Sequence, residues 1–590
     1  MSVLLFELTS VAAKLTAVFS RRQWFIVALL LVVAATFRIY VAHWLPNDLP
    51  DDGRVYAQMA RNVLEQHVYS HDPEAPFNPS LIRLPGYPLF LASVYSVFGH
   101  QNNGAVRIVQ ALIDTATCGL IALLAFYWQP DEKKKRISAV AALALAVVCP
   151  FTTVYTATIL TEVLTNFLLI ALLLAATLAL RPTLTVEDAE ENQKKKKLKK
   201  ALGWWCAAGL IGGVAVMMRP DAGLFLAAVG LTLVIGGLGP LVFGLIKKSK
   251  AEDQKPKTKE QRPRAMRIVA RVIASGAAMS FVFILVLAPW TIRNWRAFHL
   301  FQPLAPQHAE MPGEFVPRGY LLWVRSWLDD QKYVAQFLWP LEVEPIDVDE
   351  LPDSAFDSPE EKKRVAALLE KYNKPDDSEN SDTNDAATEP SPSPTPAPSR
   401  TPVTQSAKSN PIASPTPDED SDEEDNSEDS TDQEQSSVEM TPEIDAGFMQ
   451  IARERIARHP FRYYVWLPIK RARTMWFDTH SQYWPFEGEL LPLDDLDYDI
   501  HQQYWLPFFA GLTAIYSLLG LEGAWVLWRA RQLDARQWLL LAVLAIVLRL
   551  VLFSSLENPE PRYLVEFFPI LSVLGGLAIA QLTAIRFRRS

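Results

Sequence analysis

The sequence of 590 residues contains only three cysteines, Cys118, Cys149 and Cys206. An odd and scattered set of cysteines supplies no disulfide framework and has no zinc-site spacing. Each of the three lies in or beside an apolar run, where a thiol serves as a small apolar side chain. The sequence also lacks a phosphate-cradling glycine loop, a nucleophile elbow and a nucleic-acid-binding module. These absences exclude a disulfide-stabilised secreted domain and argue against a nucleic-acid partner.

Positive charge and aromatic side chains are scarce in one long segment. Residues 375–440 hold 18 Asp and Glu but only 2 Lys and Arg, a net charge of −16. Subtracting this segment from the chain's net charge of −9 leaves +7, so the rest of the chain is mildly basic. A Ser-, Pro- and acid-rich segment buries too little apolar area to offset the entropy lost on ordering. We expect 375–440 to be a disordered acidic insert.

Long apolar runs, by contrast, recur along the chain. Ten of them reach or approach the length of a bilayer-spanning helix. They cover residues 24–45, 104–128, 137–152, 159–180, 201–218, 222–246, 268–290, 504–528, 537–556 and 563–585. Each must be helical, because hydrocarbon offers no water to backbone groups. The run 137–152 is short and ends at Pro150, where it is expected to tilt or break. The sequence therefore predicts an all-α polytopic membrane protein with about ten transmembrane helices.

The distribution of Lys and Arg predicts the orientation. The first run, 24–45, is too long for a signal peptide and no small-residue cleavage site follows it, so we expect it to remain as the first span. Placing residues 1–23 in the cytoplasm puts nearly every short basic loop, and the tail 586–590, on that side. These loops are Lys133 to Arg136, Lys194 to Lys200, Lys247 to Arg267 and Arg529 to Arg536.

Two large segments then fall on the extracytoplasmic side, 46–103 between the first spans and 291–503 between the membrane block 24–290 and the C-terminal helices 504–585. Both exceed what a connection needs, so we expect function there. Within the second segment, the pattern after 443 predicts a helix that breaks at His459-Pro460 and restarts as an interfacial helix ending near Phe477.

Asp51, Asp52 and Arg83 are candidate site residues in the first extracytoplasmic segment. Either aspartate could cap the helix that follows it, and a carboxylate just outside the membrane could also act as a general base. Arg83 precedes a proline-rich entry into an apolar helix over 86–98, which is too short to cross a bilayer. Its guanidinium fits either general contact with lipid phosphates or a fixed site for one phosphate.

Other ionisable residues stand at the outer ends of the spans. Glu162 begins the fourth span, where a carboxylate inside an apolar run is costly and is a functional candidate. Each of the others alone fits an anchor at the membrane interface. The residues predicted to share this face are Asp52, Arg83, Glu162, Arg219, Arg293 and Arg562.

His67 and His71 are four residues apart and lie beside Asp72, a spacing that can hold a metal on a helix. Pro73 and the polar context indicate that the helix ends there. We therefore predict no metal site at these histidines.

Taken together, these motifs resemble those of the GT-C membrane glycosyltransferases, notably the bacterial protein O-mannosyltransferase-like proteins (glycosyltransferase family 39) and the lipid A aminoarabinose transferases. The matching stretches are Asp52 with Tyr56, Ala57 and Arg61, Arg83 to Pro88, Thr161-Glu162, Arg219-Pro220, Pro289 to Asn294, and Pro561-Arg562-Tyr563. The resemblance covers about 24–300 and 443–585. Many relatives have Asp-Glu where this chain has Asp52-Gly53, which leaves the base open between Asp51 and Asp52.

The resemblance implies inverting transfer of a sugar from a polyprenyl-phosphate donor to a lipid, glycan or protein acceptor, on the extracytoplasmic face of the bacterial inner membrane. It implies no required cofactor, although a divalent metal stays compatible with it. Asp52 or Asp51 is then the base and Glu162 positions the sugar or acceptor. The implied phosphate-binding residues are Arg83, Arg219 and Arg562, and the implied substrate-binding residues are Tyr56, Tyr87 and Arg293.

Two other function classes stay open. A transporter or lipid flippase needs polar residues at mid-depth and often two related halves. Here the ionisable residues noted above gather at one face and the halves do not match. An envelope assembly scaffold is suggested only by the acidic insert. Reconstitution separates these classes, because a glycosyltransferase moves sugar without net transport.

The predicted topology is tested with reporter fusions. Fusions after Lys135, Lys197 and Lys257 should report the cytoplasm, and fusions after Asp72 and Ala413 the outside, because Lys and Arg are retained inside. Any one fusion on the opposite side contradicts the shared face of the candidate residues.

Overall fold

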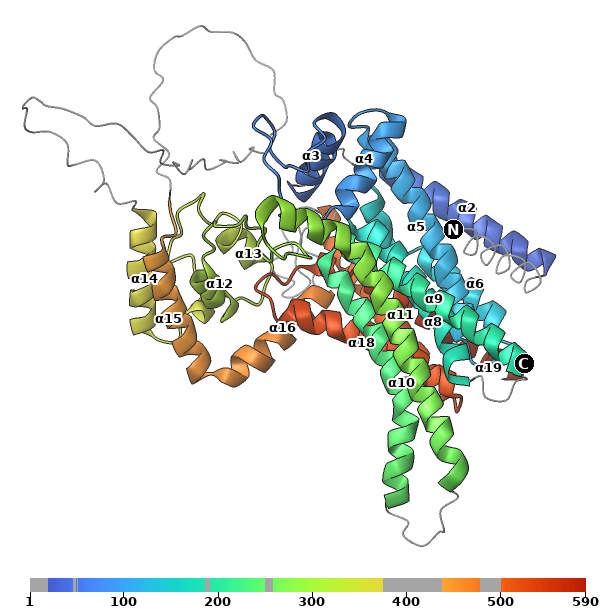
Figure 1. Cartoon of the computed structure of the whole chain (residues 1–590). Helices are drawn as coiled ribbons and strands as arrows, with labels where there is room; N and C mark the ends of the chain where they lie inside the picture. The colour runs from blue at the N-terminus through green and yellow to red at the C-terminus, as the bar shows by residue number, and fades with distance from the viewer. Residues whose placement is uncertain are drawn as a thin grey trace, which may run out of the picture.

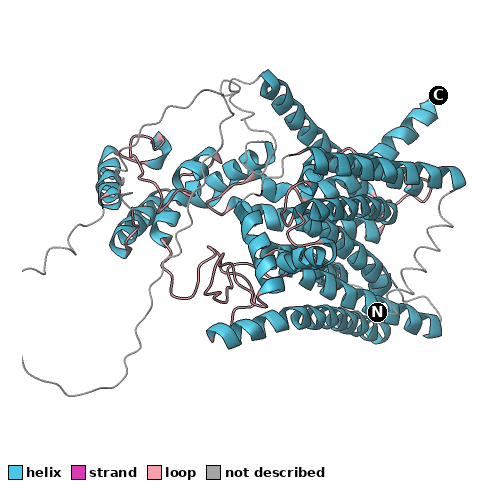
Figure 2. Ribbon diagram, turned by 90° about the horizontal axis from the view of Figure 1, so that it is seen from above, coloured by secondary structure: helices cyan, strands magenta, loops and turns pink. Residues whose placement is uncertain are grey.

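The computed structural model describes residues 20–45, 49, 51–185, 191–249, 258–374, 438–477 and 500–589. All regular structure within these ranges is helical, and no strand occurs among them (Figure 2). The all-α fold class predicted from the apolar runs is confirmed. The predicted insert lies almost entirely outside the described residues.

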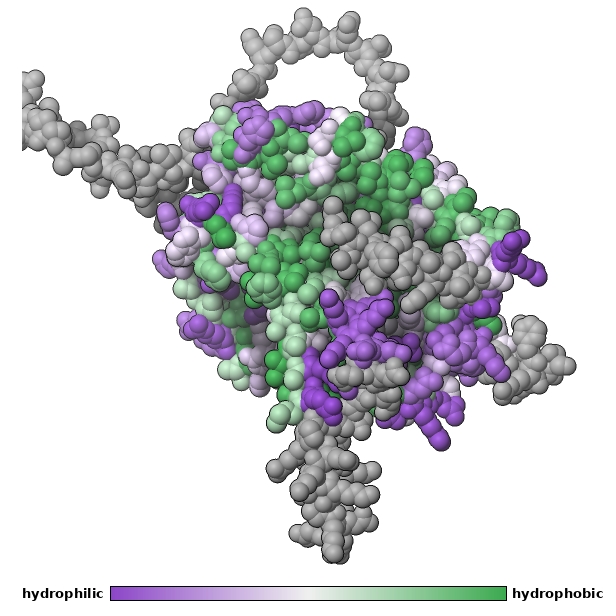
Figure 3. Space-filling view, turned by 45° about the vertical axis from the view of Figure 1, so that its right-hand side comes forward, coloured by the Kyte–Doolittle hydropathy of each residue, from purple (hydrophilic) through white to green (hydrophobic). Residues whose placement is uncertain are grey.

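Among the described residues, eight helices contain a stretch that is long and apolar enough to cross a bilayer. They are α2 (Arg21–Trp44), α5 (Asn103–Trp128), α8 (Glu162–Thr185), α9 (Glu191–Met218), α10 (Gly223–Ser249), α11 (Thr258–Phe298), α17 (Ile500–Arg529) and α18 (Leu533–Ser554). The chain is therefore a multi-pass membrane protein. Hydrophobic side chains cover broad areas of the face seen in Figure 3, with hydrophilic side chains in separate patches.

Two further predicted spans take a different form. The run 137–152 is broken into α6 (Lys135–Val147) and α7 (Pro150–Thr153), which continues as a 3-10 turn to Thr156 and is bent from α6 by 56°. The last run forms α19 (Phe567–Arg589), of which only the stretch Phe567–Thr583 counts as apolar, less than a full crossing length. The structure thus gives eight candidate spans, or nine with the bent pair.

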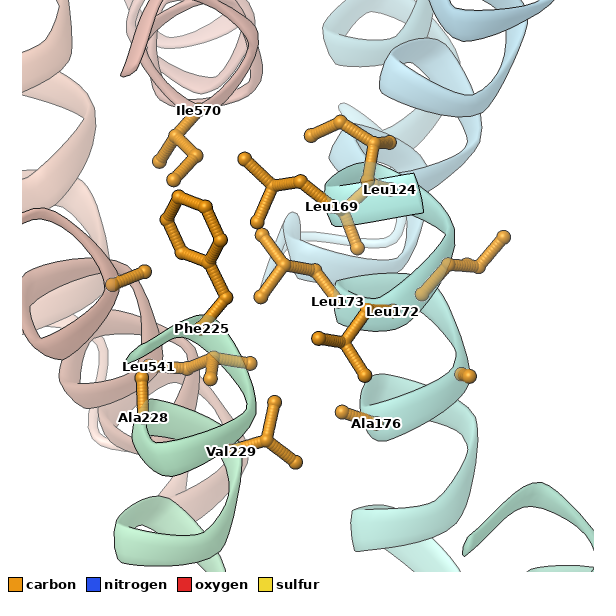
Figure 4. Packing of buried hydrophobic residues seen from close by; sticks show 14 of the residues in the cluster. Leu124, Leu169, Leu172, Leu173, Ala176, Phe225, Ala228, Val229, Leu541 and Ile570 are labelled. Carbon is orange, nitrogen blue, oxygen red and sulfur yellow. The ribbon is translucent and has the colours of Figure 1, made fainter. Parts of the chain in front are cut away.

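The core of the bundle joins the first and second halves of the chain. Figure 4 shows Leu169 and Leu173 of α8 facing Phe225 of α10, with Ile570 of α19 and Leu541 of α18 close to that phenylalanine. All of these side chains are almost fully buried. Helices separated by more than 300 residues of sequence therefore pack as one body.

A buried ion pair closes the break in the third predicted span. Pro150 has no N–H, so the carbonyl of Ala146 lacks its normal helical donor. The guanidinium of Arg38 from α2 donates to that carbonyl at 3.1 Å and to the Asp114 carboxylate of α5 at 2.6 Å. Arg38 and Asp114 lie within spans, so the ionisable residues do not all gather at the outer face.

The remaining helices lie at one end of the bundle. The first outer segment forms α3 (Asp51–Glu65) and α4 (Gly86–Phe98), and the second forms a separate lobe (Figure 1). The helices of this lobe are α12 (Arg318–Arg325), α13 (Lys332–Phe337), α14 (Pro359–Asn373) and α15 (Pro442–Arg458). As predicted, the chain breaks after Arg458, and a π-helix (Arg462–Trp466) leads into α16 (Leu467–Phe477).

The lobe has its own core, built from both sides of the acidic insert. Tyr320 and Trp323 of α12 pack on Phe448 of α15, with ring centroids 5.0 Å apart in each pair. Val438 and Met440 are also buried in this core. Val438 and Met440, at the end of the segment predicted to be disordered, therefore fold with the lobe.

Close packing of α17 on α19 can be tested at a glycine. A Cβ at Gly523 would lie 2.0 Å from the Leu574 carbonyl oxygen, whereas one at Gly511 on the same helix meets nothing within 4 Å. Overpacking costs about 1–3 kcal/mol, so Gly523→Ala should lower the thermal-unfolding midpoint of the purified protein. Gly511→Ala is the matched control and should not lower it, because Ala favours a helix over Gly. Equal midpoints would contradict this packing.

Candidate functional site

The site begins with Asp52 in the first turn of α3 and Arg83 just before α4. The Asn62 side chain of α3 donates to the carbonyls of Ser70 and Asp72, at 3.0 and 2.8 Å, and so folds the following segment back over its own helix. This fold returns Arg83 to Asp52, with 2.9 Å between Arg83 Nη2 and Asp52 Oδ1. The first ion pair therefore forms because the segment between α3 and α4 folds back over α3.

A second guanidinium reaches the same carboxylate from the far end of the chain. Arg562 lies in the 3-10 turn Pro561–Leu564 that precedes α19. Its Nη1 and Nη2 atoms are each 3.3 Å from Asp52 Oδ2. Asp52 is thus held between two arginines while its side chain remains 22% exposed.

This arrangement sets the charge of Asp52. Burial tends to raise the pKa of the Asp52 carboxyl, but the positive charges of Arg562 and Arg83 outweigh burial and hold that pKa below its usual range. The carboxylate is therefore ionised, and its lone pairs are shared between two cations. We name Asp52, Arg83 and Arg562 the outer cluster.

A second group of charges, the inner cluster, lies at the start of α8, just after α9, within α18 and just before α19. Arg219 Nη1 lies 2.9 Å from Glu162 Oε1 and 3.2 Å from Glu566 Oε1. Arg219 Nε lies 3.2 Å from Asp221, and Arg549 of α18 lies 2.9 Å from Asp221 and 3.0 Å from Glu566. Three carboxylates already engage Arg219, so it is less available to a phosphate than Arg83.

Aromatic side chains connect the two clusters. The Tyr563 ring has the Arg219 guanidinium 5.8 Å and the Arg562 guanidinium 5.6 Å from its centroid. Tyr56 stands one helical turn after Asp52, and burial together with the Asp52 charge raises its pKa to about 12. Tyr56 is therefore a neutral hydroxyl between the clusters.

Tyr87 and Arg293 serve other contacts. Tyr87 packs its ring against Tyr56 with centroids 5.1 Å apart, is fully buried, and donates its hydroxyl to Gln110 at 2.8 Å. Arg293 of α11 donates to the carbonyls of Ser80 and Tyr69 at 2.7 and 3.2 Å. Arg293 thus holds the first outer segment and does not join either cluster. The side chain of Asp51 lies outside the described residues.

Arg549 is the main residue that sequence reasoning missed. It is fully buried in the middle of the apolar run 537–556, where the surrounding Leu and Val hide it from a motif search. An arginine inside an apolar span is itself a signal of function or pairing, and that signal could have found it. Its partners Asp221 and Glu566 come from different junctions and follow only from the packing.

Within the described ranges, no three His, Cys, Asp or Glu side chains are grouped to hold a metal ion. The helix α3 ends at Glu65, before His67, whose backbone is left-handed with φ of 57°. His67 and His71 therefore do not share a helical face, as the sequence predicted.

Comparison of the chain with family models, with curated proteins and with solved structures finds no match. The motif resemblance to the GT-C glycosyltransferases stays an expectation from sequence. A function for this chain has to be inferred from the arrangement of its side chains.

Proposed function

We propose that the protein is a glycosyltransferase that moves a sugar from a polyprenyl-phosphate donor to an acceptor at the extracytoplasmic membrane surface, with inversion. The observation that carries this proposal is the outer cluster, in which one ionised carboxylate lies between two guanidiniums. A carboxylate can accept a proton, and paired guanidiniums are suited to a phosphate. Both requirements of the reaction are thus met within hydrogen-bonding distance of one another.

The outer cluster also supports an order of events. A donor phosphodiester is an anion, so it competes with Asp52 for Arg83 and Arg562. Binding of the phosphate to the arginines weakens their hold on Asp52, whose exposed oxygen is then free to accept a proton. Donor binding therefore prepares the base.

The chemical step then balances without a further group. The acceptor hydroxyl gives its proton to Asp52, and its oxygen forms a bond to the anomeric carbon. The bond from that carbon to the phosphate oxygen breaks, and its electron pair leaves with the polyprenyl phosphate. Arg83 and Arg562 stabilise the charge that grows on the leaving phosphate.

The inner cluster suits the role of support. Arg219 fixes Glu162 at the start of α8, at 2.9 Å, and Glu162 is almost fully buried. Glu162 and Tyr56 then offer an acceptor and a donor of hydrogen bonds for sugar hydroxyls. In this proposal Arg219 positions Glu162 and does not touch the donor phosphate.

The proposed membrane arrangement has ten spans, which adds the bent pair of α6 and α7 and helix α19 to the eight candidates. The N-terminus lies in the cytoplasm of a bacterial cell, and both clusters face the outside, near α3, α4 and the lobe. The basic loops support this orientation. The partners are the lipid-linked donor, membrane lipid and an outer acceptor.

The base is tested with Asp52→Asn. Asp52 lies inside the first turn of α3 and pairs with two arginines, so a purely structural role predicts a lower thermal-unfolding midpoint with turnover per folded molecule kept. A general base predicts a loss of roughly 10²–10⁴ in turnover with donor binding retained. Transfer of radiolabelled sugar and donor affinity are measured at matched expression. Normal turnover in both Asp52→Asn and Asp51→Asn, together with active Arg83→Ala, would exclude this mechanism.

The phosphate role of Arg83 predicts a different pattern. Arg83→Ala should weaken donor binding and turnover together, because the guanidinium contacts phosphate in both the ground and transition states. Arg83→Lys should restore part of each, since Lys keeps the charge but loses the fork. Full activity in the Lys variant would instead indicate a general lipid anchor.

The electrostatics of the outer cluster predict a pH effect. Asp52 acts when deprotonated, so kcat/KM falls as pH drops through its pKa, which Arg562 and Arg83 hold below the usual range. Arg562→Gln removes one charge, raises that pKa and should move the acid limb of kcat/KM to higher pH. Arg364→Gln, in an exposed pair of the lobe, should leave it in place. An unmoved acid limb in Arg562→Gln contradicts Asp52 as the base.

A further inference from the structure

A cavity of about 410 Å³ lies where the lobe meets the outer end of α18. One wall is a single face of α12, formed by Arg318, Leu321, Leu322 and Arg325. These positions follow the helical spacing i, i+3, i+4, i+7, so the side chains share one face. The cavity is completed by Met449 of α15, by Glu557 and by the segment 307–310. A volume of this size holds a small ligand or a head group.

The α12 wall combines charge with apolar surface. Its opposite face, with Tyr320, Trp323 and Val324, is buried in the core of the lobe. The cavity face instead places two leucines between two arginines. A ligand that matches this wall needs a negative charge and an apolar portion.

Arg318 is open to an anion, and Arg325 is only partly engaged by Tyr463, whose ring centroid lies 5.8 Å from its guanidinium, and by Glu557. Arg318 is exposed, and its guanidinium makes no ion pair or side-chain hydrogen bond with the rest of the described chain. Arg325 approaches Glu557 only to 3.9 Å, and its Nε atom is buried with no hydrogen-bond partner among the described residues. The other acid of the cavity, Glu310, accepts from the backbone N–H of His308 at 2.9 Å. Glu310 and Glu557 therefore do not use all the N–H donors of the two arginines, and the remaining donors can bind an anion.

The cavity lies beside the end of α18, a candidate membrane-spanning helix. Glu557 lies three residues after α18 ends. Arg471 of α16 donates to the carbonyls of Arg325 and Leu328 in the lobe and of Ser554 at the end of α18. The segment that leads into the cavity also exposes Phe301 by 75%. Apolar exposure beside a helix end fits the bilayer surface.

We infer that this cavity binds the phosphate head group of an anionic lipid. Glu557 precedes Arg562 by five residues, so the chain keeps their Cα atoms within ~18 Å of each other. The lipid site is therefore close to the outer cluster but distinct from it.

Thiol protection tests lipid binding without any turnover. The full chain with Leu322→Cys is placed in nanodiscs of phosphatidylcholine, with or without phosphatidylglycerol, and treated with a membrane-impermeant maleimide. Labelling at position 322 should slow roughly tenfold once phosphatidylglycerol reaches ten times its Kd. The unchanged chain corrects for native thiols, of which Cys118 and Cys149 are buried.

Charge variants identify the binding groups. Arg318→Gln with Arg325→Gln, in the Leu322→Cys background, should abolish protection, since lost charge-assisted hydrogen bonds weaken binding by roughly tenfold or more. Arg453→Gln, an exposed arginine of α15, should keep it. Equal melting curves show that the variants are folded. Protection that persists in the double variant overturns the inference.

Other occupants give distinct results. Protection by inorganic phosphate as strong as that by phosphatidylglycerol shows a free-anion site, and protection by an acidic peptide alone shows a protein partner. Either result overturns the lipid assignment. Release of carrier phosphate from the donor is the separate measure of the proposed function. Its absence alongside protection removes the glycosyltransferase proposal and leaves the lipid site standing.

Discussion

The contact of Asp52 with Arg83 and Arg562 is the interaction on which the outer end of the molecule depends. A partly buried carboxylate needs cations, and two neighbouring guanidiniums need an anion, so each stabilises the other. Since the partners come from the segment around α3 and from the turn before α19, the contact also joins the N-terminal and C-terminal parts of the chain. An anionic ligand can replace the carboxylate without leaving the arginines unpaired.

The inner cluster supplies rigidity beneath this contact. Arg219 and Arg549 join carboxylates from three different junctions, and all five side chains are buried or nearly so. Removing one member leaves an uncompensated charge in a medium of low dielectric constant, which is strongly unfavourable. The helices α8, α18 and α19 are therefore fixed relative to one another. This rigid network of ion pairs keeps Tyr56 and Tyr563 at a constant distance from the outer cluster.

Sequence predicted the all-helical class and most of the apolar spans, because apolar length is a local property. It placed Asp52, Arg83 and Arg562 on one side, but contact between them requires the packing of segments far apart in the chain. Arg293 was also predicted to stand at the end of a span with the other candidates. Its guanidinium instead donates to the carbonyl of Tyr69, because its direction depends on how α11 packs. The buried Arg549 and the lobe core that joins Trp323 to Phe448 across the insert are likewise non-local. The hydrophobic periodicity of a single segment carries no information about contacts between segments far apart in the sequence.

The 510 positions between Asp52 and Arg562 have a consequence for biosynthesis. Translation proceeds from the N-terminus, so Asp52 and Arg83 are in place while the ribosome has most of the chain still to make. Arg562, Arg549 and Glu566 arrive only with the final helices. A nascent or truncated chain therefore holds two of the three residues of the outer cluster and three of the five residues of the inner cluster. Both clusters are therefore completed only in the last step of synthesis.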